Sequence, residues 1–89
     1  MALHLVYSIR GFSACHPRLQ QEDVVVLLAD GVYCAVNPTA ADNTQNADLR
    51  VMTDDLEIRG LTTVSGKRID YPDLVELCTQ HTPIISWND

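Results

Sequence analysis

The feature that most constrains the fold is an apolar run at residues Asp23–Ala29, which reads DVVVLLA. Valine and leucine follow one another after the aspartate with no polar residue between them, so both faces of an extended segment would be apolar. A strand of this kind is typical of the centre of a parallel sheet, where helices cover both faces. The sequence therefore predicts a buried central strand in an α/β domain.

Strand-like and helix-like segments alternate along the rest of the chain. The expected strands are Ala2–Ser8, Asp23–Ala29, Leu49–Thr53, Val64–Tyr71 and Ile84–Trp87. The expected helices are one that begins between Ser13 and Pro17, one after Asp30-Gly31, one capped by Asp54 or Asp55 and ended by Gly60, and one that opens at Tyr71-Pro72-Asp73. This alternation predicts a single domain over residues 1–89, with a mainly parallel sheet of about five strands between helices.

Size and charge exclude several classes of protein. No apolar stretch approaches the roughly 20 residues of a membrane span, and the formal net charge of −6 has the wrong sign for gripping a phosphate backbone. The N-terminal segment lacks the basic region and the cleavage site of a signal peptide. We expect a cytoplasmic protein that contacts neither membrane nor nucleic acid directly, and whose own core is thin because the domain is small.

No metal or cofactor site is expected. The three cysteines contain no CxxC pair, and the histidines at positions 4, 16 and 81 lack metal-ligand spacing. No glycine-rich phosphate loop is present. Cys34 has apolar neighbours, and Cys78 shares a helical stripe with Leu74 and Leu77, so both thiols are expected to pack in the core.

The Asp30-Gly31 pair allows two interpretations. It follows the central strand, and ligands of parallel sheets bind at the carboxyl ends of strands. A small ligand-binding module is therefore one possibility. Aspartate and glycine are also ordinary turn residues, and on that interpretation the pair only leads the strand into a helix. Arg59 is expected to pair with Asp55 or with a partner subunit.

Other side chains have mainly structural interpretations. The polar segment Asn37–Asp48 is expected to form a surface loop. His4 lies in an expected buried strand and should be a hydrogen-bonded core histidine. Trp87, with Tyr33 and Tyr71, is a candidate interface anchor, since aromatic side chains dominate binding energy at interfaces.

Five parts of the sequence together match a known pattern. In chain order they are LHLVYS, VVVLLADGVYCAV, DDLEIRGL, IDYPDLVELCTQH and the closing tryptophan. Combined, they span nearly the whole chain and resemble the TusB/DsrH family of small sulfur-relay subunits. The resemblance implies a small Rossmann-like fold of three α/β/α layers.

The resemblance also implies partners and a pathway. Family members assemble with TusC/DsrF-like and TusD/DsrE-like subunits into a heterohexamer. The TusBCD form passes persulfide sulfur from a TusA-like to a TusE-like carrier for 2-thiouridine formation at the tRNA wobble position, and the DsrEFH form serves sulfur oxidation. Relatives commonly have a helix-forming stretch where this chain has Asn37–Asp48, so a homodimer or a monomer of the isolated chain stays open.

Cys15 is the candidate sulfur acceptor. In TusBCD the main sulfur-accepting cysteine belongs to the TusD-like subunit, which implies a structural role for a TusB-like chain. The DsrH branch differs by a cysteine fifteen residues ahead of the Asp-Gly pair, and Cys15 lies at that distance from Asp30.

The residues around Cys15 permit two hypotheses. In the first turn of a helix, with Arg10, His16 and Arg18 nearby in sequence, the thiol would have a lowered pKa and could carry persulfide sulfur. Alternatively, Cys15 packs inward beside Phe12, as free cysteines commonly do. The chain is then a non-catalytic assembly subunit.

Overall fold

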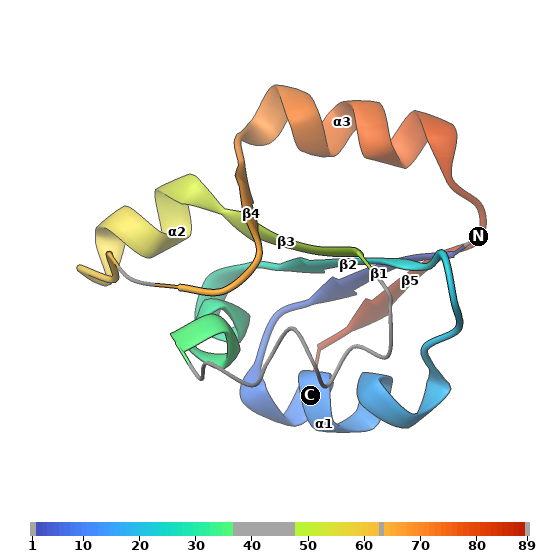
Figure 1. Cartoon of the computed structure of the whole chain (residues 1–89), viewed down its shortest axis with the longest axis horizontal. Coiled ribbons are helices and arrows are strands. Elements are labelled where there is room, and N and C mark those ends of the chain that lie inside the picture. The colour runs from blue at the N-terminus through green and yellow to red at the C-terminus, as the bar shows by residue number, and fades with distance from the viewer. Residues whose placement is uncertain (1, 37–47, 63, 89) are drawn as a thin grey trace.

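A five-stranded, all-parallel sheet forms the centre of the protein (Figure 1). The computed structural model describes residues 2–36, 48–62 and 64–88. The strands are β1 (Leu3–Val6), β2 (Val24–Leu27), β3 (Asp48–Met52), β4 (Lys67–Ile69) and β5 (Ile84–Trp87), in the spatial order β4-β3-β2-β1-β5. The predicted α/β fold with a parallel sheet of about five strands is confirmed.

Helical segments cover both faces of this sheet. They are α1 (Ile9–Cys15), η1 (His16–Arg18), η2 (Ala29–Val36), α2 (Thr53–Ile58) and α3 (Tyr71–Gln80), of which η1 and η2 are 3₁₀ helices. Figure 1 shows α3 on one side of the sheet and α1 with η2 on the other. The three-layer, Rossmann-like arrangement is therefore present.

The central strand β2 contributes to the core on both faces. Its side chains Val24 and Val26 pack with Leu77 of α3, whereas Val25 and Leu27 pack in the cluster beneath α1 and η2. All four β2 residues are buried. Burial on both faces explains why the apolar run of this strand shows no alternation.

Helix α1 begins earlier than its sequence predicts. We expected a start between Ser13 and Pro17, which is wrong: Ser8 is the N-cap, and its hydroxyl accepts a hydrogen bond from the backbone N–H of Gly11 at 2.9 Å. The α-helix ends at Cys15 because Pro17 has no N–H to continue the hydrogen-bond ladder. Cys15 thus lies in the last turn of α1 and not in the first.

The boundaries of α2 and β4 also differ from expectation. Neither Asp54 nor Asp55 caps α2, because the N-cap is Met52 and both aspartates lie in the first turn, where they interact favourably with the helix dipole. Gly60, with a φ of 67°, follows this helix as predicted. Strand β4 is shorter than Val64–Tyr71, since Asp70 caps α3 and Tyr71 is its first residue.

The remaining expectations concern α3 and the polar segment. Leu74, Leu77 and Cys78 all pack against the sheet, as the helical stripe predicted. Of the expected loop Asn37–Asp48, residues 37–47 lie outside the described part of the chain, and Asp48 begins β3. Among the described residues, no helix has the length and apolar character required to cross a bilayer.

Candidate functional site

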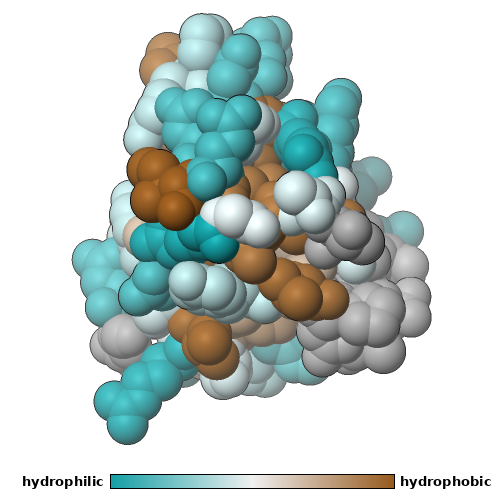
Figure 2. Space-filling view, turned by 90° about the vertical axis from the view of Figure 1, so that its left-hand side faces the viewer, coloured by the Kyte–Doolittle hydropathy of each residue, from teal (hydrophilic) through white to brown (hydrophobic). Residues whose placement is uncertain are grey.

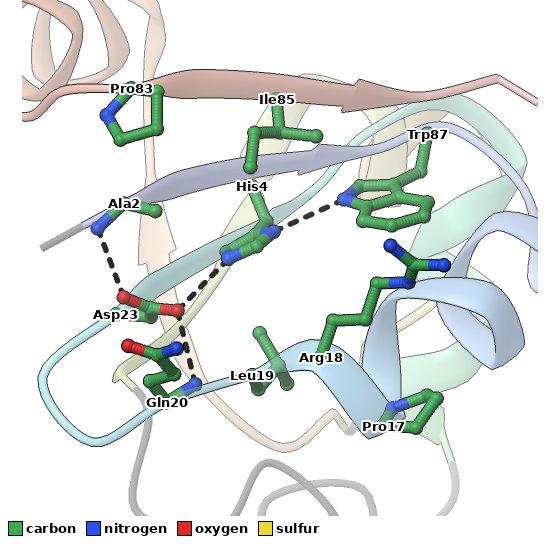
Figure 3. A pocket seen from close by; sticks show the side chains of 10 residues that line it. All are labelled: Ala2, His4, Pro17, Arg18, Leu19, Gln20, Asp23, Pro83, Ile85 and Trp87. Atoms are coloured by element: carbon green, nitrogen blue, oxygen red, sulfur yellow. Dashed lines mark hydrogen bonds and ion pairs between the residues drawn. The ribbon is translucent and has the colours of Figure 1, made fainter.

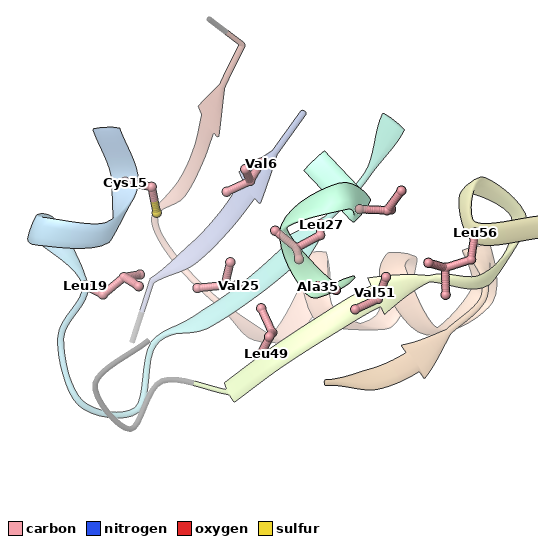
Figure 4. Packing of buried hydrophobic residues seen from close by; sticks show 10 residues of the cluster. Val6, Cys15, Leu19, Val25, Leu27, Ala35, Leu49, Val51 and Leu56 are labelled. Carbon is pink, nitrogen blue, oxygen red and sulfur yellow. The ribbon is translucent and has the colours of Figure 1, made fainter. Parts of the chain in front are cut away.

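The first candidate position, Cys15, is enclosed by the core. Its side chain has no exposed surface and belongs to the cluster between α1 and the sheet. Figure 4 shows the sulfur pointing toward the strands, with Leu19 beside it. Burial, and secondly the carboxylate of Asp23, raise the pKa of Cys15 to about 12.

Two physical conditions for a reactive thiol are thus missing at Cys15 in this conformation. A persulfide acceptor needs thiolate character and access, but the raised pKa keeps the sulfur protonated at neutral pH. The helix dipole does not lower the pKa of this thiol either. Helix N-termini and not C-termini stabilise thiolates, and Cys15 ends its helix. The observed packing is that of a small core residue.

The other two thiols are free and half-buried. Cys34, in η2, packs at the margin of the α1-side cluster, and burial raises its pKa. Cys78, in α3, packs at the margin of the opposite cluster. Both positions agree with the expected role as core residues.

The second candidate position, Asp30-Gly31, is occupied by intramolecular contacts. The guanidinium of Arg59 pairs with Asp30 at 2.9 Å and with Asp55 at 3.7 Å, and it lies over the ring of Tyr33. A Cβ on Gly31 would lie 2.4 Å from the carbonyl oxygen of Val6, so the glycine permits close packing of two backbones. These contacts favour the structural interpretation of the pair.

The structure brings together a third group of residues, in a pocket of about 660 Å³ on the α1 side of the sheet. Figure 3 shows them: strands β1 and β5 form one wall, and the segment that follows α1 forms the other. The lining residues are Ala2, His4, Pro17, Arg18, Leu19, Gln20, Asp23, Pro83, Ile85 and Trp87.

Two buried polar side chains, His4 and Asp23, form the floor of this pocket. Their exposed fractions are 2% and 5%, and Nε2 of His4 lies 3.0 Å from Oδ2 of Asp23. The indole N–H of Trp87 donates to Nδ1 of His4 at 3.1 Å. An indole nitrogen can only donate, so Nδ1 is the acceptor and the proton of neutral His4 resides on Nε2.

The carboxylate of Asp23 accepts three hydrogen bonds. Besides His4, it accepts the backbone N–H groups of Ala2 at 2.9 Å and Gln20 at 3.1 Å. Burial alone would raise the pKa of Asp23, but these hydrogen bonds outweigh it and hold the pKa below its ordinary value. A charged Asp23 is therefore stable although it is buried.

Arg18 stands at the open side of the same pocket. Its guanidinium lies 5.9 Å from the centre of the Trp87 ring and is exposed. Within residues 2–36, 48–62 and 64–88, no carboxylate forms an ion pair with Arg18. The pocket thus combines a floor that holds the hydrogen-bonded carboxylate of Asp23 with a cation at its mouth.

Sequence analysis found part of this arrangement. The expectation that His4 is a hydrogen-bonded core histidine is confirmed. Asp23 was treated only as the start of a strand, although an aspartate that opens a fully apolar strand is a signal for a buried, hydrogen-bonded carboxylate. In the described ranges, no three metal-ligating side chains gather.

Comparison with known proteins decides the family. The model of the family described as DsrH like protein matches residues 6–84. This chain belongs to the DsrH-like family. Its members are sulfur-relay subunits that work with partner subunits, so this DsrH-like protein is a sulfur-relay subunit in that general sense.

The fold comparison agrees with this assignment. The solution NMR structure of protein Tm0979 from Thermotoga maritima superposes with a TM-score of 0.71, at 25% sequence identity, over 90% of this chain and 93% of that one. No curated protein matches the sequence. The family match includes Cys15, Arg18 and Asp23, whereas His4 and Trp87 lie beyond its two ends.

Proposed function

We propose that this DsrH-like protein is an assembly subunit of a TusBCD-like complex that passes persulfide sulfur for 2-thiouridine formation at the tRNA wobble position. The observation that carries the proposal is the family match over residues 6–84. The partners would be TusC/DsrF-like and TusD/DsrE-like subunits in a cytoplasmic heterohexamer. TusA-like and TusE-like carriers would interact with the whole complex.

The state of the thiols supports an assembly role. Cys15 is buried with a raised pKa, and Cys34 and Cys78 are half-buried at the margins of the core clusters. Sulfur would then be accepted by a cysteine of a partner. The net charge of −6 supports the further point that the tRNA would not bind this subunit directly.

Exposed apolar side chains mark where the partners would dock. Ile9, Tyr33, Val36 and Ile58 are exposed, and they lie on adjacent elements that follow the carboxyl ends of β1, β2 and β3. Figure 2 shows hydrophobic side chains among polar ones on the face that carries α2. Apolar surface of this kind is typical of subunit contacts.

Co-expression with TusC-like and TusD-like subunits tests the proposal. The three chains should co-purify and give one species in native mass spectrometry. Ile58→Glu should abolish co-purification, because it places a charge in the proposed interface. Val75→Glu, at another exposed apolar position, on α3, is the control and should leave the complex intact. Failure of the unmodified chain to join either partner would refute the assembly role.

A second candidate function is a persulfide carrier of the DsrH type, with Cys15 as acceptor. The spacing of fifteen residues between Cys15 and Asp30 favours it. In the transfer, the Cys15 thiolate would attack the outer sulfur of a donor persulfide, the new S–S bond would form, and the donor would leave as a thiolate. Helix α1 would first have to move away from the sheet, since Cys15 is buried.

Mass spectrometry separates the two functions. The assembled complex is incubated with a cysteine desulfurase, cysteine and a TusA-like carrier, and each subunit is weighed. A gain of one sulfur atom on this chain, absent in Cys15→Ser, would support carriage. An unmodified chain beside a persulfidated TusD-like subunit would support the assembly role alone.

A further inference from the structure

We propose that the pocket between β5 and the segment after α1 binds a small organic carboxylate, with Arg18 as the residue that takes the carboxylate group. This binding site is separate from Cys15 and from the proposed subunit contacts. The inference goes beyond the sulfur-relay role and does not depend on it. It derives from the charge, the polarity and the shape of the pocket.

The charge at the mouth of the pocket, that of Arg18, favours an anion. Asp23 is the one carboxylate among the lining residues, and its two oxygens already accept three hydrogen bonds from Ala2, His4 and Gln20. Both ring nitrogens of His4 are also engaged. N–H donors of the protein therefore compensate much of the negative charge of Asp23, which makes the floor a poor site for a cationic ligand.

Arg18 supplies the unused donors. The contact of its guanidinium with the Trp87 ring is made by the cation and consumes none of its N–H groups as hydrogen bonds. A planar guanidinium presents paired N–H groups that match a carboxylate in bidentate fashion. Because Arg18 has no ion-pair partner in the described part of the chain, it is available for an external anion.

The remaining walls are apolar and identify the rest of the ligand. Pro17, Leu19, Pro83, Ile85 and the indole of Trp87 surround the polar floor. A volume of about 660 Å³ falls in the range of small-molecule sites, which are mostly apolar with a few placed polar groups. An anionic group at Arg18 and a flat apolar body against Trp87 would match this lining.

Benzoate is a suitable probe, and Trp87 is a built-in reporter. The chain contains one tryptophan, so its indole N–H gives a single, resolved signal in heteronuclear NMR. Titration of the full chain with benzoate should shift this signal saturably, with a dissociation constant on the order of 1 mM for so small a ligand. Neutral benzamide should bind at least roughly tenfold more weakly than benzoate, because it lacks the negative charge.

Two variants test the role of Arg18. Arg18→Gln should weaken benzoate binding by roughly tenfold or more, since a charge-assisted hydrogen-bond pair is lost. Arg10→Gln removes another exposed cation, which does not line the pocket, and benzoate binding should be retained. Both positions are exposed, so the remaining NMR signals should show an intact fold.

A third variant tests the charge of the site without changing Arg18. Gln20 is exposed at the pocket, and Gln20→Glu adds a negative charge there, which should also weaken benzoate. The proposal is overturned if the Trp87 signal does not shift saturably. It is also overturned if Arg18→Gln binds benzoate normally, or if benzamide or inorganic phosphate binds as well as benzoate.

Discussion

Trp87 donates its indole N–H to Nδ1 of His4, and this bond joins the last strand of the sheet to the first. Both side chains lie on the α1 side of the sheet, where their ring centroids are 6.2 Å apart and their planes differ by 23°. The bond fixes the tautomer of His4, which in turn directs Nε2 to Asp23. These three residues thus hold the β5 edge of the sheet to its centre.

Replacement of Trp87 by phenylalanine should destabilise the protein by about 1–3 kcal/mol, because Nδ1 of the buried His4 would lose its donor. Urea unfolding followed by circular dichroism measures the change. Tyr71→Phe, at an exposed position on α3, is the control and should change stability by less than about 0.5 kcal/mol. Equal effects of the two substitutions would contradict a role for the indole bond.

Asp23→Asn should lower the free energy of unfolding by about 3–5 kcal/mol, more than the Trp87 substitution does. An amide cannot accept all the hydrogen bonds that the buried carboxylate accepts. Asp48→Asn provides the comparison. Asp48 pairs with Arg50 at 2.7 Å near the surface, and loss of that pair should cost about 1 kcal/mol or less. Comparable losses at both sites would show that burial of Asp23 is not important.

The lowered pKa of Asp23 predicts a pH dependence of stability. Its ordinary value is 3.8, and the folded protein holds it lower. As pH falls below about 4, the unfolded chain binds the proton before the folded one does, so the stabilisation by Asp23 is lost progressively. The difference in unfolding free energy between the wild type and Asp23→Asn should therefore be constant at neutral pH and narrow below pH 4. A difference that widens in acid would contradict this sign.

Cys15 should react with thiol reagents far more slowly than Cys34 or Cys78 in the native protein. It is fully buried and its pKa is raised to about 12, whereas the other two thiols are partly accessible. Labelling followed by peptide mass spectrometry gives the three rates, and labelling in urea gives the unfolded reference. Rapid native labelling of Cys15 would show that α1 opens readily, which would favour the persulfide-carrier function.

Gly31→Ala should destabilise the protein by about 3 kcal/mol, near the upper end of overpacking effects. The added Cβ would lie 2.4 Å from the Val6 carbonyl oxygen, and neither backbone can move freely in the core. Gly60→Ala is the matched control. Gly60 has a positive φ, but no atom lies within 4 Å of the position that an alanine Cβ would take. Only about 1 kcal/mol of backbone strain is therefore expected. Thermal unfolding of both variants tests whether Gly31→Ala is more destabilising than Gly60→Ala.

Much of the fold could be predicted because local patterns and tertiary packing agree. The apolar run at Val24–Leu27 marks a strand buried on both faces, and Tyr71-Pro72-Asp73 marks the first turn of α3. The start of α1 could not be predicted in the same way. Ser8 and Ser13 are both acceptable N-caps, and the choice depends on where β1 ends in the sheet.

The pocket could not be predicted because its parts come from distant segments. His4 and Trp87 are 83 residues apart and meet only because β5 pairs with β1. The local sequence of Asp23 does not identify Ala2 and Gln20 as the donors of its backbone hydrogen bonds. The burial of Cys15 likewise follows from the early start of α1, which turns this residue toward the sheet.

The position of β1 between β2 and β5 has a consequence for biosynthesis. Before β5 is synthesised, β1 can pair with β2, but its other edge has no neighbour. That edge stays open until the residues of β5 leave the exit tunnel. Until β5 is available, the nascent polypeptide therefore carries an unprotected strand edge at which chaperones or other chains can bind.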